Sequence, residues 1–448
     1  MRSVSGLRGI VGADLVPAVV ERYGAAFGAF VGARGGRTVA LARDSRQSGP
    51  AFVAAASEGL RRAGLDVVNL GMVPTPTAQL AVELQGLDGG IVVTASHNPV
   101  EWNALKFIGR GGRFLAKPEV EALFALVDAG GPVGGARAGV ERRDDGAVRA
   151  HLGRVLGLSW LDLARVRRRR FRVALDCVRG AGATIMPALL EALGCEVRAI
   201  NLEPDGRFPR EPEPIPEHLG ELGDLVRRTG SDVGLAVDPD VDRLALVDET
   251  GRPIGEDYTL AFAVRAALAH RAGPVVTNLS TSLVVDDAAR AFGVRVERAP
   301  VGEANVVERM AAAGAVVGGE GNGGAILPEA HLGRDAPVAA TLALTLLAAH
   351  GAPVSALVNS APRYAIVKAK LPRPPGSLEP AYAALAAAVP GASQDRQDGL
   401  RLALADRWVH VRPSGTEPVV RIIAEAPSRD EAAELIERGR TALTERGR

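Results

Sequence analysis

The strongest constraint on the fold is an alternation that runs along the whole chain. Short apolar runs rich in β-branched residues alternate with alanine-rich stretches of helical periodicity. Such chains build units in which helices cover a parallel or mixed sheet. Helices are predicted over 44–64, 182–194 and 304–314. Strands are predicted over 38–44, 90–96, 171–176, 233–238, 243–249 and 315–320, so we predict an α/β protein.

The length of 448 residues exceeds what one hydrophobic core supports, and roughly 100–200 residues per domain predicts several units. A Gly-, Ala- and Asp-rich stretch over 130–146 precedes the first break, and the pattern restarts at Phe171. A proline-rich loop over 203–219 lies inside the second unit. The last unit is predicted to contain strands near 364–369, 400–412 and 419–426 and a helix over 429–443. The predicted domains are 1–150, 151–254, 255–358 and 359–448.

Composition excludes several classes of function. Hydrophobic residues make up 47% of the chain, and no apolar run approaches the roughly 20 residues of a membrane span. The N-terminus lacks a secretion signal, which predicts a cytoplasmic protein. Net charge is +1, and the basic run 165–172 is better explained as a linker or helix end than as a nucleic-acid site. Cys177 and Cys195 are predicted to be core residues and form no disulfide or zinc pattern.

The motif TASHNP (94–99) follows a predicted strand directly. Open α/β sheets bind their ligands at the ends of such strands, which places the hydroxyl of Ser96 where a ligand would lie. His97, Asn98 and the backbone N–H groups of the turn could hold oxyanions. The alternative interpretation is a simple turn at the end of the strand.

The motif AVDPDVDR (236–243) places Asp238, Asp240 and Asp242 directly behind another apolar strand. Carboxylates packed so closely repel one another, and a hard divalent cation relieves that repulsion. A calcium loop of the EF-hand type is excluded, because its glycine position is occupied by Arg243 and strand-like residues follow. A solvated acidic turn is the remaining alternative to a metal site.

Two further motifs are weaker when each stands alone. The run GGEGNGG (318–324) offers Glu320 and Asn322 as partners for sugar hydroxyls, although a glycine-rich turn is the simpler interpretation. The loop of VRPSGTEPVVR (411–421) lies between two predicted strands, and a hairpin without a ligand is its alternative. Its hydroxyls, turn N–H groups and guanidinium group suit a phosphate, and they come from Arg412, Ser414, Gly415 and Thr416.

Together, the order and types of these motifs resemble the α-D-phosphohexomutase superfamily, which comprises phosphoglucomutases, phosphomannomutases and phosphoglucosamine mutases. SHNP resembles the family's phosphoserine loop, DPDVDR its metal loop, GGEGNGG its sugar loop and RPSGTEP its phosphate loop. GLRG (6–9) resembles an N-terminal motif that places Arg8 beside the phosphoserine. The resemblance implies three similar α/β domains with mixed sheets and a C-terminal α+β domain around a central cleft.

The resemblance also implies a mechanism. Ser96 would carry a phosphate to the hexose and receive the other phosphate back, with a hexose 1,6-bisphosphate as intermediate and activator. Asp238, Asp240 and Asp242 would hold Mg²⁺ together with a phosphate oxygen on Ser96. Positive charge near the transferring phosphate would come from Arg8 and Arg243. Glu320 and Asn322 would bind sugar hydroxyls, and the phosphate that stays on the sugar would bind Arg412, Ser414, Gly415, Thr416 and Arg421.

Lys106 is the predicted general base. The chain has 4 lysines and 49 arginines, so a lysine in a motif stands out, and lysine can release a proton where arginine cannot. The stretch SHNPVEWNALK matches the family's pattern at Lys106 and Asn103. An ordinary surface lysine is the alternative.

The chain departs from the family at two positions. Many members end the sugar loop with a histidine where this chain has Gly324, and some carry a second histidine where it has Glu303. A histidine acid or base is therefore not expected on that side. His331, in HLGRDA, could compensate, although a capping or packing role explains it better.

The predicted function is the interconversion of hexose 6-phosphate and hexose 1-phosphate by a monomer or homodimer. Glucosamine phosphate is the favoured hexose, because SHNPVEWNALKF, EPDGRFPREPEPIPE and PVGEANV look most like the archaeal-type phosphoglucosamine mutase branch. A carboxylate from Glu303 could also meet a C2 ammonium group. A phosphoglucomutase/phosphomannomutase is the main alternative. A metal-dependent sugar phosphatase and a binder without catalysis are more distant ones.

Overall fold

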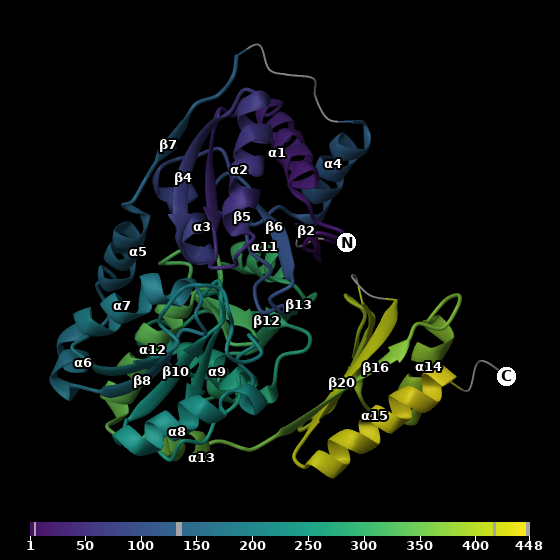
Figure 1. Ribbon diagram of the computed structural model, residues 1–448. Coiled ribbons are helices and arrows are strands. Elements are labelled where there is room, and N and C mark those ends of the chain that lie inside the picture. Colours follow the sequence, from purple (N-terminus) through teal and green to yellow (C-terminus); the bar gives the residue numbers. More distant parts are fainter. Residues whose placement is uncertain (4–5, 131–136, 415–417, 445–448) are drawn as a thin grey trace.

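The computed structural model describes residues 1–3, 6–130, 137–414 and 418–444. Four β-sheets follow one another along the chain and define four units, which are numbered in chain order below. Figure 1 shows the first unit in purple and blue, the second and third in teal and green, and the fourth in yellow beside them. No helix within the described residues is long and apolar enough to cross a membrane.

The first unit has a seven-stranded mixed sheet in the order β1-β2-β6-β5-β3-β4-β7. Alternate residues of β3 (Thr38–Arg43) face opposite ways. Val39 and Leu41 pack with α1, α2 and α4, whereas Ala40 and Ala42 pack with α3. The other elements are β1 (Arg2–Ser3), β2 (Gly6–Ile10), β4 (Asp66–Met72), β5 (Gly90–Val93), β6 (Trp102–Ile108), β7 (Glu141–Arg143), α1 (Pro17–Gly32), α2 (Gly49–Arg62), α3 (Thr75–Leu84) and α4 (Lys117–Asp128).

The second unit has the sheet order β11-β10-β8-β9, in which two parallel pairs carry one antiparallel edge strand. All residues of β10 are buried, as expected for a central strand made of one apolar run. Its elements are α5 (Ala147–Leu156), α6 (Leu163–Arg169), β8 (Arg172–Asp176), a 3₁₀ turn (Ala181–Thr184), α7 (Met186–Ala192), β9 (Glu196–Ile200), a second 3₁₀ turn (Pro216–His218), α8 (Gly220–Thr229), β10 (Val233–Val237) and β11 (Leu244–Val247).

The third unit repeats this arrangement with the order β13-β12-β14-β15 and an antiparallel edge strand. One continuous hydrophobic core joins it to the second unit, since Leu175 and Val237 belong to the same cluster as Val275 and Leu344. Its elements are α9 (Asp257–His270), β12 (Val275–Asn278), α10 (Leu283–Arg290), β13 (Val296–Ala299), α11 (Glu303–Ala313), β14 (Val317–Glu320), β15 (Gly324–Ile326), α12 (Ala336–His350) and α13 (Val354–Asn359).

The fourth unit is an antiparallel sheet in the order β16-β20-β19-β18-β17, with a core of its own. Figure 1 shows α15 running along this sheet. Its elements are β16 (Ala365–Pro372), α14 (Glu379–Ala388), β17 (Ser393–Asp395), β18 (Leu400–Ala403), β19 (Trp408–Pro413), β20 (Val419–Ala426) and α15 (Arg429–Thr444). The predicted fold class is confirmed, with three mixed-sheet units and a different C-terminal one.

The structure refines three predicted elements. The strand expected over 400–412 is two strands, β18 and β19, joined by a turn. The helix expected over 182–194 begins as a 3₁₀ turn and continues as α7 with Pro187 in its first turn, where proline is tolerated. The boundary expected after residue 150 falls inside α5, and the bounds of the four domains stay predictions.

The basic run 165–172 forms helix α6 and the start of β8. Arg165 donates hydrogen bonds to the carbonyl oxygens of Ala348 and Ala349 near the end of α12, and Arg167 donates to Ala192 at the end of α7. Cations near helix C-termini satisfy the last carbonyl groups. Of the two cysteines, both free, Cys177 is buried and Cys195 packs against the core.

The fourth unit docks on the third through buried polar contacts. Glu425 accepts hydrogen bonds from the hydroxyl and backbone N–H at the start of α10, where Ser282 is the N-cap residue and Leu283 follows. His410 accepts from the Ser280 hydroxyl at 2.8 Å and donates from Nε2 to the carbonyl oxygen of Asp398 at 2.7 Å. Both ring nitrogens are therefore used by a neutral imidazole.

This docking predicts a pH dependence of stability. Burial lowers the pKa of His410 from 6.5 to about 4, so the folded chain binds fewer protons than the unfolded chain between these values. Stability is then lost as the pH falls through this window, by about 2 kcal/mol at pH 5. Urea unfolding of wild type and His410→Gln at pH 7 and pH 5 measures this loss, which the variant should lack. Equal pH dependence in both proteins would contradict the assignment.

Candidate active site

Ser96 lies in a tight turn directly after β5. The strand ends at Val93, and the Ser96 N–H donates to the Thr94 hydroxyl at 2.9 Å. Ser96 has a φ of +50°, a left-handed conformation that is uncommon for residues other than glycine. Its hydroxyl donates to Asp238 Oδ2 at 2.8 Å, across the boundary between the first and second units. The turn therefore presents the serine oxygen to the second unit.

Arg46, which the sequence analysis missed, holds this turn in place. Its guanidinium donates to four backbone carbonyl groups of the turn, those of Ser96, Asn98, Pro99 and Trp102, at 2.6 to 2.8 Å. Its Nε also pairs with the buried Asp44 carboxylate at 3.1 Å. The sequence predicts only the start of a helix at DSR (44–46), and nothing local in this stretch indicates contacts with a loop so distant in sequence.

The three predicted metal ligands lie together in the loop between β10 and β11. Asp238, Asp240 and Asp242 are buried, and one carboxylate oxygen from each lies within 4.8 Å of the others. Thr75, at the start of α3, donates its hydroxyl to Asp240 Oδ2 at 2.6 Å and its N–H to the Asp240 carbonyl oxygen at 2.9 Å. Thr75 of the first unit thus fixes the acidic loop of the second unit through two hydrogen bonds.

Lys106 projects from β6 onto the same loop. Its ammonium group lies 2.7 Å from Asp240 Oδ2 and 3.2 Å from Asp242 Oδ2. Burial opposes protonation of Lys106, but these two carboxylates outweigh it and hold its pKa above the usual value. Lys106 is therefore a charged counter-ion here, and its role as a general base stays a prediction.

The acidic loop fits a divalent cation. The Oδ1 atoms of Asp240 and Asp242 are buried and accept no hydrogen bond from any described residue. Burial and the charges of Asp242 and Asp240 raise the pKa of Asp238 well above its usual value. Burial also opposes ionisation of Asp242, yet Arg334 and Lys106 hold its pKa below the usual range. A hard cation would meet the unused oxygens and relieve this repulsion.

Cationic side chains surround the Ser96 turn. Arg8, on β2, donates to Asn98 Oδ1 at 2.6 Å, and burial together with Arg243 lowers its pKa. Arg243 pairs with Glu213 of the proline-rich loop at 3.0 Å. The His97 ring lies 3.3 Å from the Ser96 hydroxyl, and burial and the two arginines push its pKa well below 6.5. This concentration of positive charge suits a phosphate dianion.

The predicted sugar loop, residues 318–324, belongs to the third unit. Glu320 Oε1 accepts from Asn278 at 2.8 Å and from the Gly302 N–H at 3.0 Å, so the carboxylate is held in one orientation. Asn322 Oδ1 lies 3.3 Å from the Gly324 N–H. His331 does not join this loop but contacts Asp335 at 2.8 Å, as a packing role predicts.

Arg334 is the second residue that the sequence analysis missed. Its guanidinium reaches Asp242 at 2.7 Å, Glu303 at 2.9 Å and Glu320 at 3.1 Å. The acidic loop of the second unit and the sugar loop of the third therefore share one buried cation. Arginine is so frequent in this chain that its presence in HLGRDA gave no distinctive signal.

The predicted phosphate loop lies in the fourth unit. Arg412 on β19 and Arg421 on β20 are direct cross-strand partners, and Lys370 on β16 is the partner of Arg421. Directly opposite residues share a face of the sheet, so three cations lie in a row across it. Arg412 also pairs with Asp398 at 2.7 Å, and the Ser414 N–H bonds to Val419. Gly415 and Thr416 lie outside the described residues.

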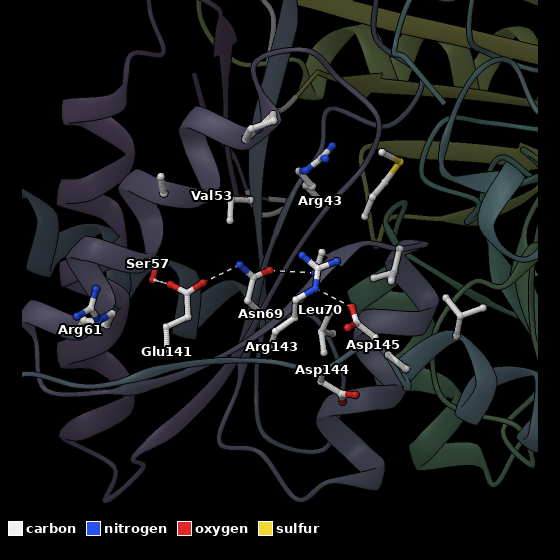
Figure 2. Close-up of a pocket in the computed structure, with 17 residues that line it drawn as sticks. Arg43, Val53, Ser57, Arg61, Asn69, Leu70, Glu141, Arg143, Asp144 and Asp145 are labelled. Atoms are coloured by element: carbon white, nitrogen blue, oxygen red, sulfur yellow. Dashed lines mark hydrogen bonds and ion pairs between the residues drawn. The ribbon is translucent and has the colours of Figure 1, made fainter. Parts of the chain in front are cut away.

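A separate cavity of about 740 Å³ lies between the first unit and the start of α5, and none of these side chains lines it. Figure 2 shows its polar lining, in which Ser57 and Asn69 both contact Glu141, and Arg143 contacts Asp145. Its arginines (Arg43, Arg61, Arg143) are matched in number by its carboxylates (Glu141, Asp144, Asp145). The charges balance, so this cavity gives no indication of a charged ligand.

Comparisons with known families cover almost the whole chain. Three descriptions for "Phosphoglucomutase/phosphomannomutase, alpha/beta/alpha" domains I, II and III match residues 2–132, 155–251 and 255–364, and that for the C-terminal domain matches 367–442. The chain belongs to the phosphoglucomutase/phosphomannomutase family. It is therefore an enzyme of the mutase type, an intramolecular phosphotransferase of the α-D-phosphohexomutase superfamily.

Similar proteins carry two kinds of name. A "Probable phosphoglucosamine mutase" of Methanopyrus kandleri is 38% identical over 96% of this chain and 95% of its own length. A "Phosphoglucomutase/phosphomannomutase" of Thermococcus kodakarensis is 36% identical over 98% and 97%. A solved structure of a phosphoglucomutase/phosphomannomutase family protein from Burkholderia thailandensis has a TM-score of 0.86 at 30% identity, covering 99% of this chain and 98% of that one. The names agree on the reaction class and differ on the hexose.

The acidic loop predicts a measurable effect of Asp240→Asn on cation binding. The substitution removes one carboxylate charge and one unused oxygen, so the dissociation constant for Mn²⁺, used as a probe for Mg²⁺, should rise at least about tenfold. Calorimetric titration of the full chain measures it. The exposed Asp224→Asn on α8 makes the same charge change elsewhere and should leave Mn²⁺ binding unaltered. Equal affinity in wild type and Asp240→Asn would rule out a metal site here.

Proposed function

We propose that this mutase interconverts hexose 6-phosphate and hexose 1-phosphate, that Ser96 is its phosphate carrier, and that its hexose is glucosamine. The observation that carries the proposal is the 2.8 Å contact between the Ser96 hydroxyl and Asp238. It places the candidate nucleophile at a cluster of carboxylates with unused oxygens. Phosphoryl transfer depends mainly on such positioning and on neutralisation of charge.

The side chains of the site would have separate roles in the transfer of the phosphoryl group. Asp238, Asp240 and Asp242 would hold Mg²⁺, which supplies charge neutralisation to the phosphate oxygens when bound. Arg8 and Arg243 would bind the phosphate on Ser96, because both lie around its turn. During transfer the bond from phosphorus to Ser96 Oγ breaks and a bond to the sugar hydroxyl forms. The hydroxyl proton must pass to a base, for which Lys106 remains the candidate on sequence grounds.

The second half of the reaction returns the other phosphate of the bisphosphate to Ser96. A hexose 1,6-bisphosphate that escapes before this step leaves the serine without phosphate, so added bisphosphate should act as an activator. The cation row of the fourth unit would bind whichever phosphate is not transferring, through Arg412, Arg421 and the loop residues Ser414, Gly415 and Thr416. Lys370 extends that row and adds a candidate absent from the motif.

The choice of glucosamine rests on similarity. Seven of the similar proteins are named "Probable phosphoglucosamine mutase" or "Phosphoglucosamine/phosphogalactosamine mutase". The suggested contact of Glu303 with a C2 ammonium gains no support, since Arg334 and Gln79 already donate to its carboxylate. Glu320 and Asn322 would meet hydroxyls that glucose and glucosamine share. A phosphoglucomutase/phosphomannomutase is the second candidate, favoured by the name of the Thermococcus relative at 36% identity.

Replacing Ser96 tests the carrier assignment. Mass spectrometry should find a phosphoryl group on Ser96 in the purified wild type, and Ser96→Ala should lose roughly a thousand-fold in kcat or more because the nucleophile is gone. Ser393→Ala, at an exposed serine of the fourth unit, should keep wild-type turnover. Activity of Ser96→Ala close to that of wild type, with glucose 1,6-bisphosphate present, would contradict the proposal.

The hexose is tested by competing substrates. Glucosamine 6-phosphate should have a kcat/KM at least tenfold above those of glucose 6-phosphate and mannose 6-phosphate, which corresponds to about 1.4 kcal/mol of transition-state binding. Coupled assays of the three sugars at one Mg²⁺ concentration measure this ratio. If glucose or mannose phosphate is turned over tenfold more efficiently, the glucosamine assignment gives way to the phosphoglucomutase/phosphomannomutase alternative.

A further inference from the structure

Arg334 lies between β15 and α12, outside every motif that defines the site. Each nitrogen of its guanidinium faces a different carboxylate: Nη2 faces Asp242 at 2.7 Å, Nε faces Glu303 at 2.9 Å, and Nη1 faces Glu320 at 3.1 Å. All four side chains are buried. The planar fork of arginine suits this arrangement, because its donors point in fixed and different directions.

The space for Arg334 exists because residue 324 is glycine. A Cβ atom added at Gly324 would lie 2.2 Å from Arg334 Cδ, so no larger residue fits beside the arginine. This is the position where the resemblance implies a histidine in many members of the family. Here the cation reaches the end of the sugar loop from a different segment of the chain, and Glu303 contacts it.

The backbone around Arg334 is held firmly. The next residue, Asp335, accepts hydrogen bonds from His151 Nε2 at 2.7 Å and His331 Nε2 at 2.8 Å. Its other oxygen accepts the Val338 N–H at 2.9 Å and caps α12. His151 in turn bonds to the Thr77 hydroxyl of the first unit at 2.8 Å. The arginine is therefore presented to the site by contacts that are independent of any ligand.

Because Arg334 contacts Asp242, its positive charge would repel a divalent cation bound to the same aspartate. Asp242 Oδ2 already accepts hydrogen bonds from Arg334 at 2.7 Å and from Lys106 at 3.2 Å. A divalent cation bound to Asp242 would lie close to both positive charges, and like charges repel strongly where water is excluded. Arg334 must therefore weaken cation binding, although it orders the carboxylates around it.

We propose that Arg334 is a positioning residue that ties the metal loop to the sugar loop, lowering the affinity of the site for divalent cations while fixing Glu320 for the hexose. The inference rests on the proposed function of the two loops. In a variant without the positive charge, binding of divalent cations should become tighter and binding of the hexose should become weaker. Loss of the cation leaves Asp242 more attractive to a metal ion, and it leaves Glu303 and Glu320 as unbalanced buried carboxylates that no longer hold the sugar loop.

Arg334→Gln in the full chain tests both the expected gain in cation affinity and the expected loss in hexose binding. Calorimetric titration with Mn²⁺ should give a dissociation constant at least threefold below that of wild type. The KM for the hexose 6-phosphate that the wild type turns over best, among glucosamine, glucose and mannose, should rise at least tenfold. Arg309→Gln, at a half-exposed arginine of α11 paired with Glu297, serves as the control and should change neither value.

Arg334→Lys separates charge from geometry. Lysine keeps the positive charge but cannot span three carboxylates, so Mn²⁺ affinity should return to the wild-type value while KM stays raised. Weaker or unchanged Mn²⁺ binding in Arg334→Gln, or an unchanged KM, would overturn the inference. If Arg334→Gln does not fold, a wild-type KM in Arg334→Lys would overturn it equally.

The proposed function has its own control in the same experiment. A wild type that binds Mn²⁺ no better than Asp240→Asn would show that the acidic loop is not a metal site, and both proposals would fail. A wild type that binds Mn²⁺ at this loop and turns over a hexose phosphate, together with an Arg334→Gln variant that behaves like it, would remove only the role given to Arg334.

Discussion

Burial of three aspartates at the end of β10 is the constraint on which the site depends. Isolated buried carboxylates are costly, and the second unit itself supplies Arg243 as a nearby cation. The other charges come from elsewhere: Lys106 belongs to the first unit and Arg334 to the third. The negative charge of the acidic loop is therefore balanced by cations from three units.

The same balance of charge explains why Arg46, Arg334 and Lys106 are placed differently. Arginines hold loops by donating in several directions at once, as Arg46 does to the carbonyl groups of the Ser96 turn and Arg334 does to three carboxylates. Lys106 instead brings one compact charge to two aspartates. Lys106 contacts mainly the acidic loop, so its position can change when a ligand binds there. Arg46 and Arg334 each hold several groups at once and stay in place.

The sequence predicted most of what depends on local order. Central strands such as β10 were visible as apolar runs, and the positions of Ser96 and Asp238 followed from the ends of strands, where α/β sheets place ligands. Contacts between units left no such signal. Arg46 and Arg334 look like any other arginine in a chain that has 49 of them, and their partners lie far away in the sequence. Only packing shows which ones face buried acceptors.

The hydrophobic core that runs without interruption from the second unit into the third has an evolutionary consequence. Asp242 lies in a loop of the second unit and Glu320 in the third unit, and both form ion pairs with Arg334. Exchange of either half between relatives would separate side chains that balance one another's charge. These two segments are therefore expected to be inherited as one block, whereas the fourth unit, with its own core and a polar contact surface, can diverge more freely.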